Sequence, residues 1–167
     1  FVDNSYHSAK ALSIIHHKKS GDLVVIKNKH VKNDAFQETE KWESFISHND
    51  RNVYFVMIAN FFSYKDQETV IKAWGKLKQD HNCKLILAGL GGPKSCHDKF
   101  HAMRKLTDTL ALNEDVLFLG SVKNTTKLLS IMDVGILSTN MEGCPNAVLD
   151  YMSASLPVIA TNIAGNI

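Results

Sequence analysis

VYFVMI, at residues 53–58, is the stretch that decides the fold. Its apolar residues are continuous rather than alternating, which is typical of a strand buried on both faces of a sheet. Val70, Trp74 and Leu77 then follow at helical spacing. The same succession of an apolar run and a helical segment recurs toward the C-terminus. It predicts strands at residues 53–58, 84–88, 116–119, 134–137 and 157–160.

Strands that alternate with single helices form βαβ units, so the predicted fold class is α/β. We expect a Rossmann-like parallel sheet, covered by helices on both faces and connected by right-handed crossovers. Ligands of such sheets bind outside the carboxyl ends of the strands. The segments that follow the predicted strands are therefore the candidates for a site: residues 59–66, 89–95, 120–124, 138–146 and 161–165.

The N-terminal region does not share this alternation. Residues 23–26 predict a strand and residues 38–47 a helix, but residues 1–34 otherwise lack the βαβ pattern. We interpret residues 1–34 as the tail of a preceding domain with its linker, and residues 35–167 as the main domain. Because the chain opens without an initiator Met, we expect it to be a piece of a longer protein. We also expect the main domain, residues 35–167, to be truncated at its C-terminus.

The composition narrows the class of protein. No apolar stretch approaches the roughly 18 residues that a membrane helix needs. The three cysteines, Cys83, Cys96 and Cys144, show neither CxxC spacing nor the density of a disulfide scaffold, which favours a reducing cytoplasm. A net charge of +2 is too small to indicate a nucleic-acid partner.

The stretch EGCPNAVLD at residues 142–150 carries the strongest signal for a site. Glu142 precedes a helix in which Pro145 occupies the place of a first helical residue. Free amides and the helix dipole make such a terminus an anion site. Asp150 lies one and a half turns into the helix, so its carboxylate can reach the same crevice. This arrangement suits a phosphorylated sugar, although a capped helix with solvated acids has the same sequence features.

A longer pattern resembles a known family. Residues 138–161 resemble the retaining glycosyltransferases of family 4, or group 1, whose signature is Glu, seven residues, Glu, a small-residue helix, Leu-Pro-Val and Ala-Thr. Further matches occur in the order of the family's loops, at residues 25–28, 59–61 with Lys65, 88–93 and 118–122. The resemblance implies a GT-B architecture of two Rossmann-like domains. Residues 35–167 would then be the nucleotide-sugar (donor) domain, and residues 1–34 the tail of the acceptor-side domain with its linker.

The resemblance also assigns roles to individual residues. Glu142 is expected to hold hydroxyls of the donor sugar, Asp150 the ribose hydroxyls, and Lys65 the diphosphate as it leaves. These roles make Glu142 and Lys65 the predicted catalytic residues. The other predicted donor-binding residues are Gly143, Cys144, Pro145, Asn146, Ala147, Asn60, Val122, which would border the base, and Gly91.

Two positions depart from the family pattern. Asp150 stands where Glu is usual, and Asn60 stands where an Arg often assists Lys65. The resemblance implies no metal and no cofactor besides the nucleotide-sugar substrate, because a lysine and helix termini stabilise the leaving group. The absence of an Asp-x-Asp motif agrees with this expectation.

The expected function is transfer of a sugar, with retention, from a nucleotide-diphosphate sugar to a glycan or lipid-linked acceptor in surface polysaccharide biosynthesis. We expect the fragment alone to be inactive, and peripheral contact with the inner face of the membrane to come through the preceding domain. A non-hydrolysing sugar epimerase and an inactive nucleotide-sugar binding module remain alternatives. A dinucleotide-dependent dehydrogenase is disfavoured because residues 59–63 contain no glycine. The base, the sugar and the acceptor stay open.

Overall fold

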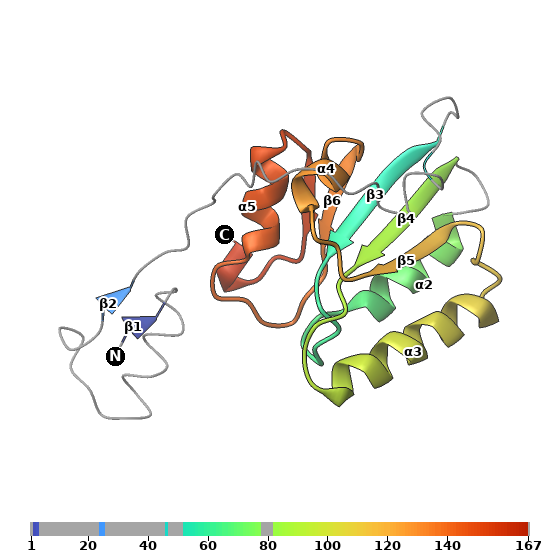
Figure 1. Ribbon diagram of the computed structural model, residues 1–167, viewed down its shortest axis with the longest axis horizontal. Helices are drawn as coiled ribbons and strands as arrows, with labels where there is room; N and C mark the ends of the chain where they lie inside the picture. The colour runs from blue at the N-terminus through green and yellow to red at the C-terminus, as the bar shows by residue number, and fades with distance from the viewer. Residues whose placement is uncertain (1, 4–23, 26–45, 47–51, 78–81, 167) are drawn as a thin grey trace.

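The computed structural model describes residues 2–3, 24–25, 46, 52–77 and 82–166. Its main feature is a five-stranded sheet of order β5-β4-β3-β6-β7, in which every pairing is parallel. The predicted α/β class and parallel sheet are thus confirmed (Figure 1). The strands are β3 (Val53–Ile58), β4 (Cys83–Ala88), β5 (Val116–Gly120), β6 (Val134–Leu137) and β7 (Val158–Ala160).

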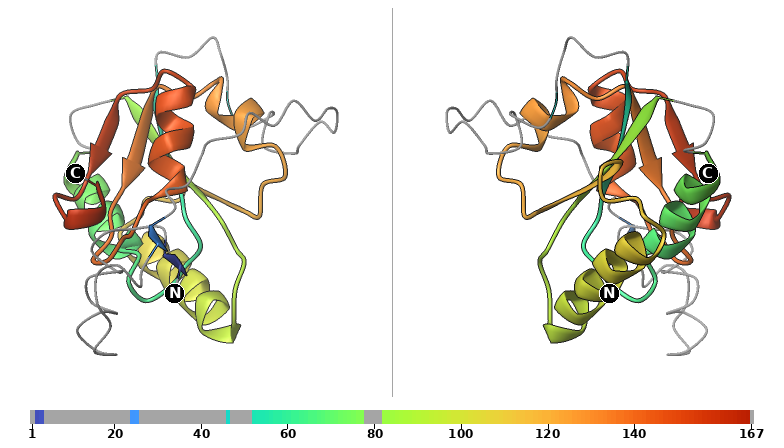
Figure 2. Two further views of the ribbon diagram at one scale, coloured as in Figure 1. Left: turned by 90° about the vertical axis from the view of Figure 1, so that its left-hand side faces the viewer. Right: turned by 90° about the vertical axis from the view of Figure 1, so that its right-hand side faces the viewer.

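The sheet is the middle of three layers. Helices α2 (Gln67–Leu77) and α3 (Lys94–Thr109) cover one face, and α4 (Thr125–Leu129) and α5 (Asn146–Ser153) cover the other (Figures 1 and 2). Each helix connects two parallel strands, as the βαβ pattern predicts. Because both faces are covered, the strands can be apolar throughout, and β4 accordingly buries five of its six residues.

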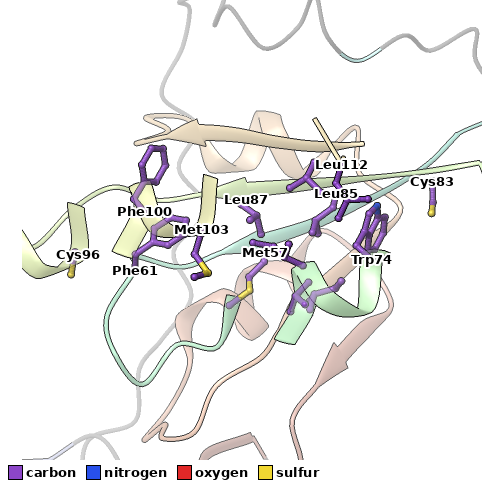
Figure 3. Close-up of a cluster of buried hydrophobic side chains, with 14 residues drawn as sticks. Met57, Phe61, Trp74, Cys83, Leu85, Leu87, Cys96, Phe100, Met103 and Leu112 are labelled. Atoms are coloured by element: carbon purple, nitrogen blue, oxygen red, sulfur yellow. The ribbon is translucent and has the colours of Figure 1, made fainter. Parts of the chain in front are cut away.

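The larger hydrophobic cluster lies between the sheet and the α2–α3 layer (Figure 3). Leu85 and Leu87 of β4 are at most 1% exposed, and Trp74 of α2 is 3% exposed. At the end of this layer the rings of Phe61 and Phe100 meet edge to face at 5.1 Å. Full burial of such side chains stabilises the fold by about 1.5–3 kcal/mol each.

The order in which the chain adds strands to the sheet reverses between β3 and β6, although all the strands stay parallel. The chain runs outward from β3 through β4 to β5, then crosses back to β6 and runs outward through β7 on the other side. Strands β3 and β6 pair over only two positions, Phe55 with Val134 and Val56 with Gly135. Beyond these positions the pairing ends, which opens a switch point where ligands of such folds bind.

Tyr151 of α5 spans this opening. Its hydroxyl accepts a hydrogen bond from the Ile58 amide at 2.7 Å and donates one to the Ile136 carbonyl at 3.2 Å. The ring approaches β6 so closely that a Cβ on Gly135 would lie 2.4 Å from it. Tyr151 is fully buried, and burial raises the pKa of its hydroxyl. A neutral hydroxyl therefore takes the place of a direct bond between the strands.

The N-terminal part contributes a separate two-stranded parallel sheet of β1 (Val2–Asp3) and β2 (Val24–Val25). Strand β2 lies within the strand predicted at residues 23–26. The predicted domain boundary at residues 34–35 lies outside the described residues. Of the helix predicted at residues 38–47, only Ile46 is described; it is not helical, and it is buried in the cluster on the α4–α5 face.

Replacement of Tyr151 by Phe should lower the free energy of unfolding by about 1–3 kcal/mol, because the Ile58 amide and the Ile136 carbonyl lose a buried partner. Urea denaturation measures the loss. Tyr64→Phe, which removes a hydroxyl from a half-buried ring, is the matched control and should unfold near the parent midpoint. Equal midpoints for parent and Tyr151→Phe would show that the hydroxyl does not join the strands.

Candidate functional site

The segments that follow β3 and β6 are bonded to each other at the switch point. The Asp66 amide donates to the Ser138 carbonyl at 2.9 Å, and the Asn140 amide donates to the Tyr64 carbonyl at 2.8 Å. Between these bonds, Lys65 and Thr139 form an antiparallel bridge. Because this bridge holds both segments in register, residues that are far apart in the sequence face each other there.

The two predicted catalytic residues are in contact. The Lys65 ammonium forms an ion pair with the Glu142 carboxylate, and their side chains are only 13% and 11% exposed. The same ammonium lies 5.5 Å from the centre of the Tyr64 ring. Burial lowers the pKa of Lys65 to about 8, whereas the adjacent carboxylate favours the charged form. The site thus presents a partly buried cation whose present partner is a carboxylate.

The segment after β7 closes on the loop that carries Glu142. The Thr161 hydroxyl accepts a bond from the Thr139 amide at 3.2 Å and donates one to the Thr139 carbonyl at 2.9 Å. A Cβ on Gly165 would lie 2.2 Å from the Glu142 carbonyl oxygen, so only glycine fits there. Thr139, Thr161 and Gly165 are not among the predicted site residues. All three lie in segments that follow predicted strands, residues 138–146 and 161–165, and Thr161 also ends the family signature.

Asn60 and Gly91 are also brought together. The Asn60 side-chain oxygen accepts a hydrogen bond from the Gly91 amide at 2.8 Å. The Asn60 carbonyl in turn accepts a bond from the Gln67 side chain, which is 1% exposed. Gly89, directly after β4, has a φ of +136°. A Cβ on Gly89 would lie 2.4 Å from the carbonyl oxygen of Ala59. Asn60 therefore ties the loop after β3 to the loop after β4.

The N-terminus of α5 differs from the prediction in one respect. Pro145 is the N-cap rather than the first helical residue, because its backbone is extended at φ −75° and ψ 112°. Its carbonyl accepts bonds from the amides of Val148 and Leu149, which fixes the start of the helix at Asn146. Ahead of these bonds, the amides of Asn146 and Ala147 lie at the positive end of the helix dipole.

The remaining predicted residues are Gly143, Cys144, Asp150 and Val122. Gly143 and Cys144, both half-buried, connect Glu142 to the N-cap. Asp150 is half-buried on α5 next to Tyr151. Its negative charge, second to burial, helps to raise the pKa of the Tyr151 hydroxyl. Val122 packs against the same hydrophobic cluster as Ala147, under α4 and α5, rather than against the ion pair. The ligand roles of all these residues stay predictions.

Two further findings concern the described residues alone. None of their helices combines the length and the apolar character that crossing a bilayer requires. Among the same residues, no three His, Cys, Asp or Glu side chains gather as metal ligands would. Independence from metal stays a prediction.

Comparison with known proteins agrees with this architecture. N-Acetyl-alpha-D-glucosaminyl L-malate synthase of Bacillus anthracis is 30% identical over 110 residues, which cover 66% of this chain and 27% of that enzyme. The glycosyltransferase from Rickettsia africae has a TM-score of 0.80 at 19% identity, covering 98% of this chain and 44% of its own. HepE of Anabaena, solved with UDP and glucose, has a TM-score of 0.80 at 20% identity, covering 99% and 45%.

The matches define both the family and the extent of the similarity. The chain spans less than half the length of each of these relatives. The two structures share the fold at low identity. Residues 38–167, most of the chain, match the family described as glycosyl transferases group 1. This chain therefore belongs to the group 1 glycosyl transferases.

Proposed function

We propose that the chain binds a nucleoside-diphosphate sugar at the β3–β6 switch point, as the donor domain of a retaining family 4 glycosyltransferase. The observation that carries this proposal is the partly buried Lys65–Glu142 ion pair beside the N-terminus of α5. HepE, solved with UDP and glucose, shares the fold, which supports a donor of this chemical class.

The ion pair provides for an exchange of partners. The donor's diphosphate replaces the Glu142 carboxylate as the partner of the Lys65 ammonium. Glu142 is then free to accept hydrogen bonds from sugar hydroxyls. The Lys65 charge and the α5 amides stabilise the negative charge that develops on the diphosphate as the bond to the sugar breaks.

The other residues complete the donor site in this proposal. Asp150 accepts hydrogen bonds from the ribose hydroxyls, and Val122 borders the base. Asn60, bonded to Gly91, shapes the loops that receive the phosphates. Residues 143–147 supply backbone contacts to the sugar and the phosphate.

In the whole protein, the sugar passes with retention to a glycan or lipid-linked acceptor, in surface polysaccharide biosynthesis. The acceptor side and any peripheral membrane contact belong to the preceding domain, and the site of action is the cytoplasm. Membership in the glycosyl transferase family favours this function over the epimerase. An inactive binding module would bind the same donor but would not transfer the sugar.

A panel of nucleotide sugars tests the proposal. Calorimetry on the chain should find at least one UDP-, GDP- or ADP-sugar that binds, and NMR of the product of the full-length protein should show the anomeric configuration of the donor. Absence of binding across the panel would refute the donor site. Binding without turnover by the full-length protein would indicate an inactive module.

Lys65→Ala should weaken binding of the best nucleotide sugar by about tenfold or more, because a charged hydrogen bond to phosphate contributes about 1.5–3 kcal/mol. The bare nucleoside should bind almost unchanged. Lys72→Ala removes a lysine that is 58% exposed on α2 and serves as the matched control in the same calorimetric titrations. Parent-like affinity of Lys65→Ala for the nucleotide sugar would show that Lys65 does not meet the diphosphate.

The affinity should also depend on pH. Because the pKa of Lys65 is about 8, its positive charge is present below pH 8 and is lost as the pH rises through that value. Binding of the nucleotide sugar, whose diphosphate does not titrate in this range, should therefore weaken by up to about tenfold per pH unit between pH 8 and 9.5. Titrations of Lys65→Ala should lack this decline; the same decline in that variant would assign it to another group.

Glu142 and Asp150 should differ in their ligands. Glu142→Gln removes the carboxylate that competes for Lys65, so the nucleoside diphosphate should bind at least as tightly as to the parent. Turnover of the full-length protein should fall, because the orientation of the sugar is lost. Asp150→Ala should weaken both nucleoside diphosphate and nucleotide sugar by about tenfold, since both contain ribose.

Asp150→Glu, which restores the length usual in the family, should bind about as well as the parent. Glu68→Gln changes a carboxylate that is 51% exposed and is the control for the loss of a negative charge. Weaker nucleoside diphosphate binding by Glu142→Gln would contradict the exchange of partners.

A further inference from the structure

Lys99 directs its ammonium toward backbone carbonyls of the loop after β3. It lies in the first half of α3 and is half-buried. Its Nζ donates hydrogen bonds to the Phe62 carbonyl at 2.9 Å and to the Lys65 carbonyl. Both carbonyls belong to the loop after β3, so one side chain of α3 holds two points of the loop that carries Lys65.

The bonded loop is a tight turn. The Lys65 amide donates to the Phe62 carbonyl at 3.1 Å, so this carbonyl accepts from Lys65 and from Lys99 together. An ammonium group has three donors and can satisfy two carbonyls at once. Loss of Lys99 would leave the partly buried Lys65 carbonyl without this partner at a cost in free energy, which favours keeping the turn in one conformation.

Apolar contacts hold the same loop against the same helix. Phe61, at the start of the turn, packs edge to face on Phe100, the residue next to Lys99. The Phe62 ring stacks on the Tyr64 ring at 5.4 Å, and a Cβ on Gly92, just before α3, would lie 3.3 Å from the Phe62 ring. The far end of the loop is bonded to the segment after β6. With its backbone held on both sides, Lys65 has few alternative positions.

We propose that Lys99 is a positioning residue for Lys65: by bonding the carbonyls of Phe62 and Lys65, it holds the Lys65 ammonium where it meets the donor's diphosphate. The inference rests on the proposed function. Lys99 itself does not touch the donor and acts through the loop. Its loss should therefore change diphosphate binding only as long as Lys65 is present.

Inorganic pyrophosphate is the probe, because it needs neither the base nor the sugar to be known. Lys99→Met keeps the apolar stem and removes the donors, and it should bind pyrophosphate about three- to tenfold more weakly than the parent in calorimetry. Lys105→Met, an exposed lysine on the same helix, is the matched control and should bind like the parent. Lys99→Arg, which keeps charged donors, should recover part of the affinity.

A double-mutant cycle separates positioning from general destabilisation. In the Lys65→Ala background, Lys99→Met should cause no further loss of pyrophosphate affinity. Circular dichroism monitors folding. If Lys99→Met does not fold, Lys99→Gln, which retains one amide donor, replaces it and should show an intermediate loss.

The outcomes distinguish this inference from the proposed function. Parent-like binding by Lys99→Met or by folded Lys99→Gln, together with weak binding by Lys65→Ala, overturns the positioning role alone. Equal losses from Lys99→Met with and without Lys65 also overturn it. Failure of the parent to bind pyrophosphate, or parent-like binding by Lys65→Ala, overturns the role of Lys65 and this inference with it.

Discussion

The hydroxyl of Tyr151 joins β3 and β6, the two parallel strands between which the order of strand addition reverses. Strands β3 and β6 stop pairing after two positions, and the hydroxyl bonds the Ile58 amide to the Ile136 carbonyl beyond that point. Gly135 makes the contact possible, because any Cβ there would collide with the ring. The pairing of β3 and β6 can therefore end without leaving these two backbone groups unpaired.

The order of the strands determines which residues meet. Since β3 and β6 are neighbours, the segments after them bond to each other, and Lys65 comes to face Glu142. The Thr161 hydroxyl bonds the segment after β7 to Thr139, and this segment packs against the loop that carries Glu142. A cation and a carboxylate, both nearly buried, therefore lie beside the N-terminus of a helix. This combination of charges suits a ligand that carries both phosphates and hydroxyls.

The loop after β3, which carries Lys65, is held by residues that follow β4. Helix α3 bonds the loop after β3 through Lys99, and Gly91 bonds the same loop through Asn60. Asn60 is one of the two positions at which the sequence departs from the family pattern. The structure gives this departure a physical role, because the asparagine side-chain oxygen accepts a bond from the Gly91 amide, whereas an arginine side chain has donors only. The loop geometry thus depends on Asn60, whatever it contributes to phosphate binding.

The sequence by itself determined the five strands and their parallel arrangement, because hydrophobic periodicity and βαβ connections are local properties of the chain. It predicted the edge of the sheet at which a ligand is expected. It also indicated Lys65 and Glu142, through a resemblance. It misplaced Pro145 by one position, since the residue before a helix and its first residue have similar sequence signals. Only the tertiary structure decided that Lys65 contacts Glu142, that Tyr151 joins β3 to β6 and that Lys99 bonds the loop of Lys65. These contacts depend on the order of the strands and on the close packing of helices against them, and neither is written in the spacing of residues along the chain.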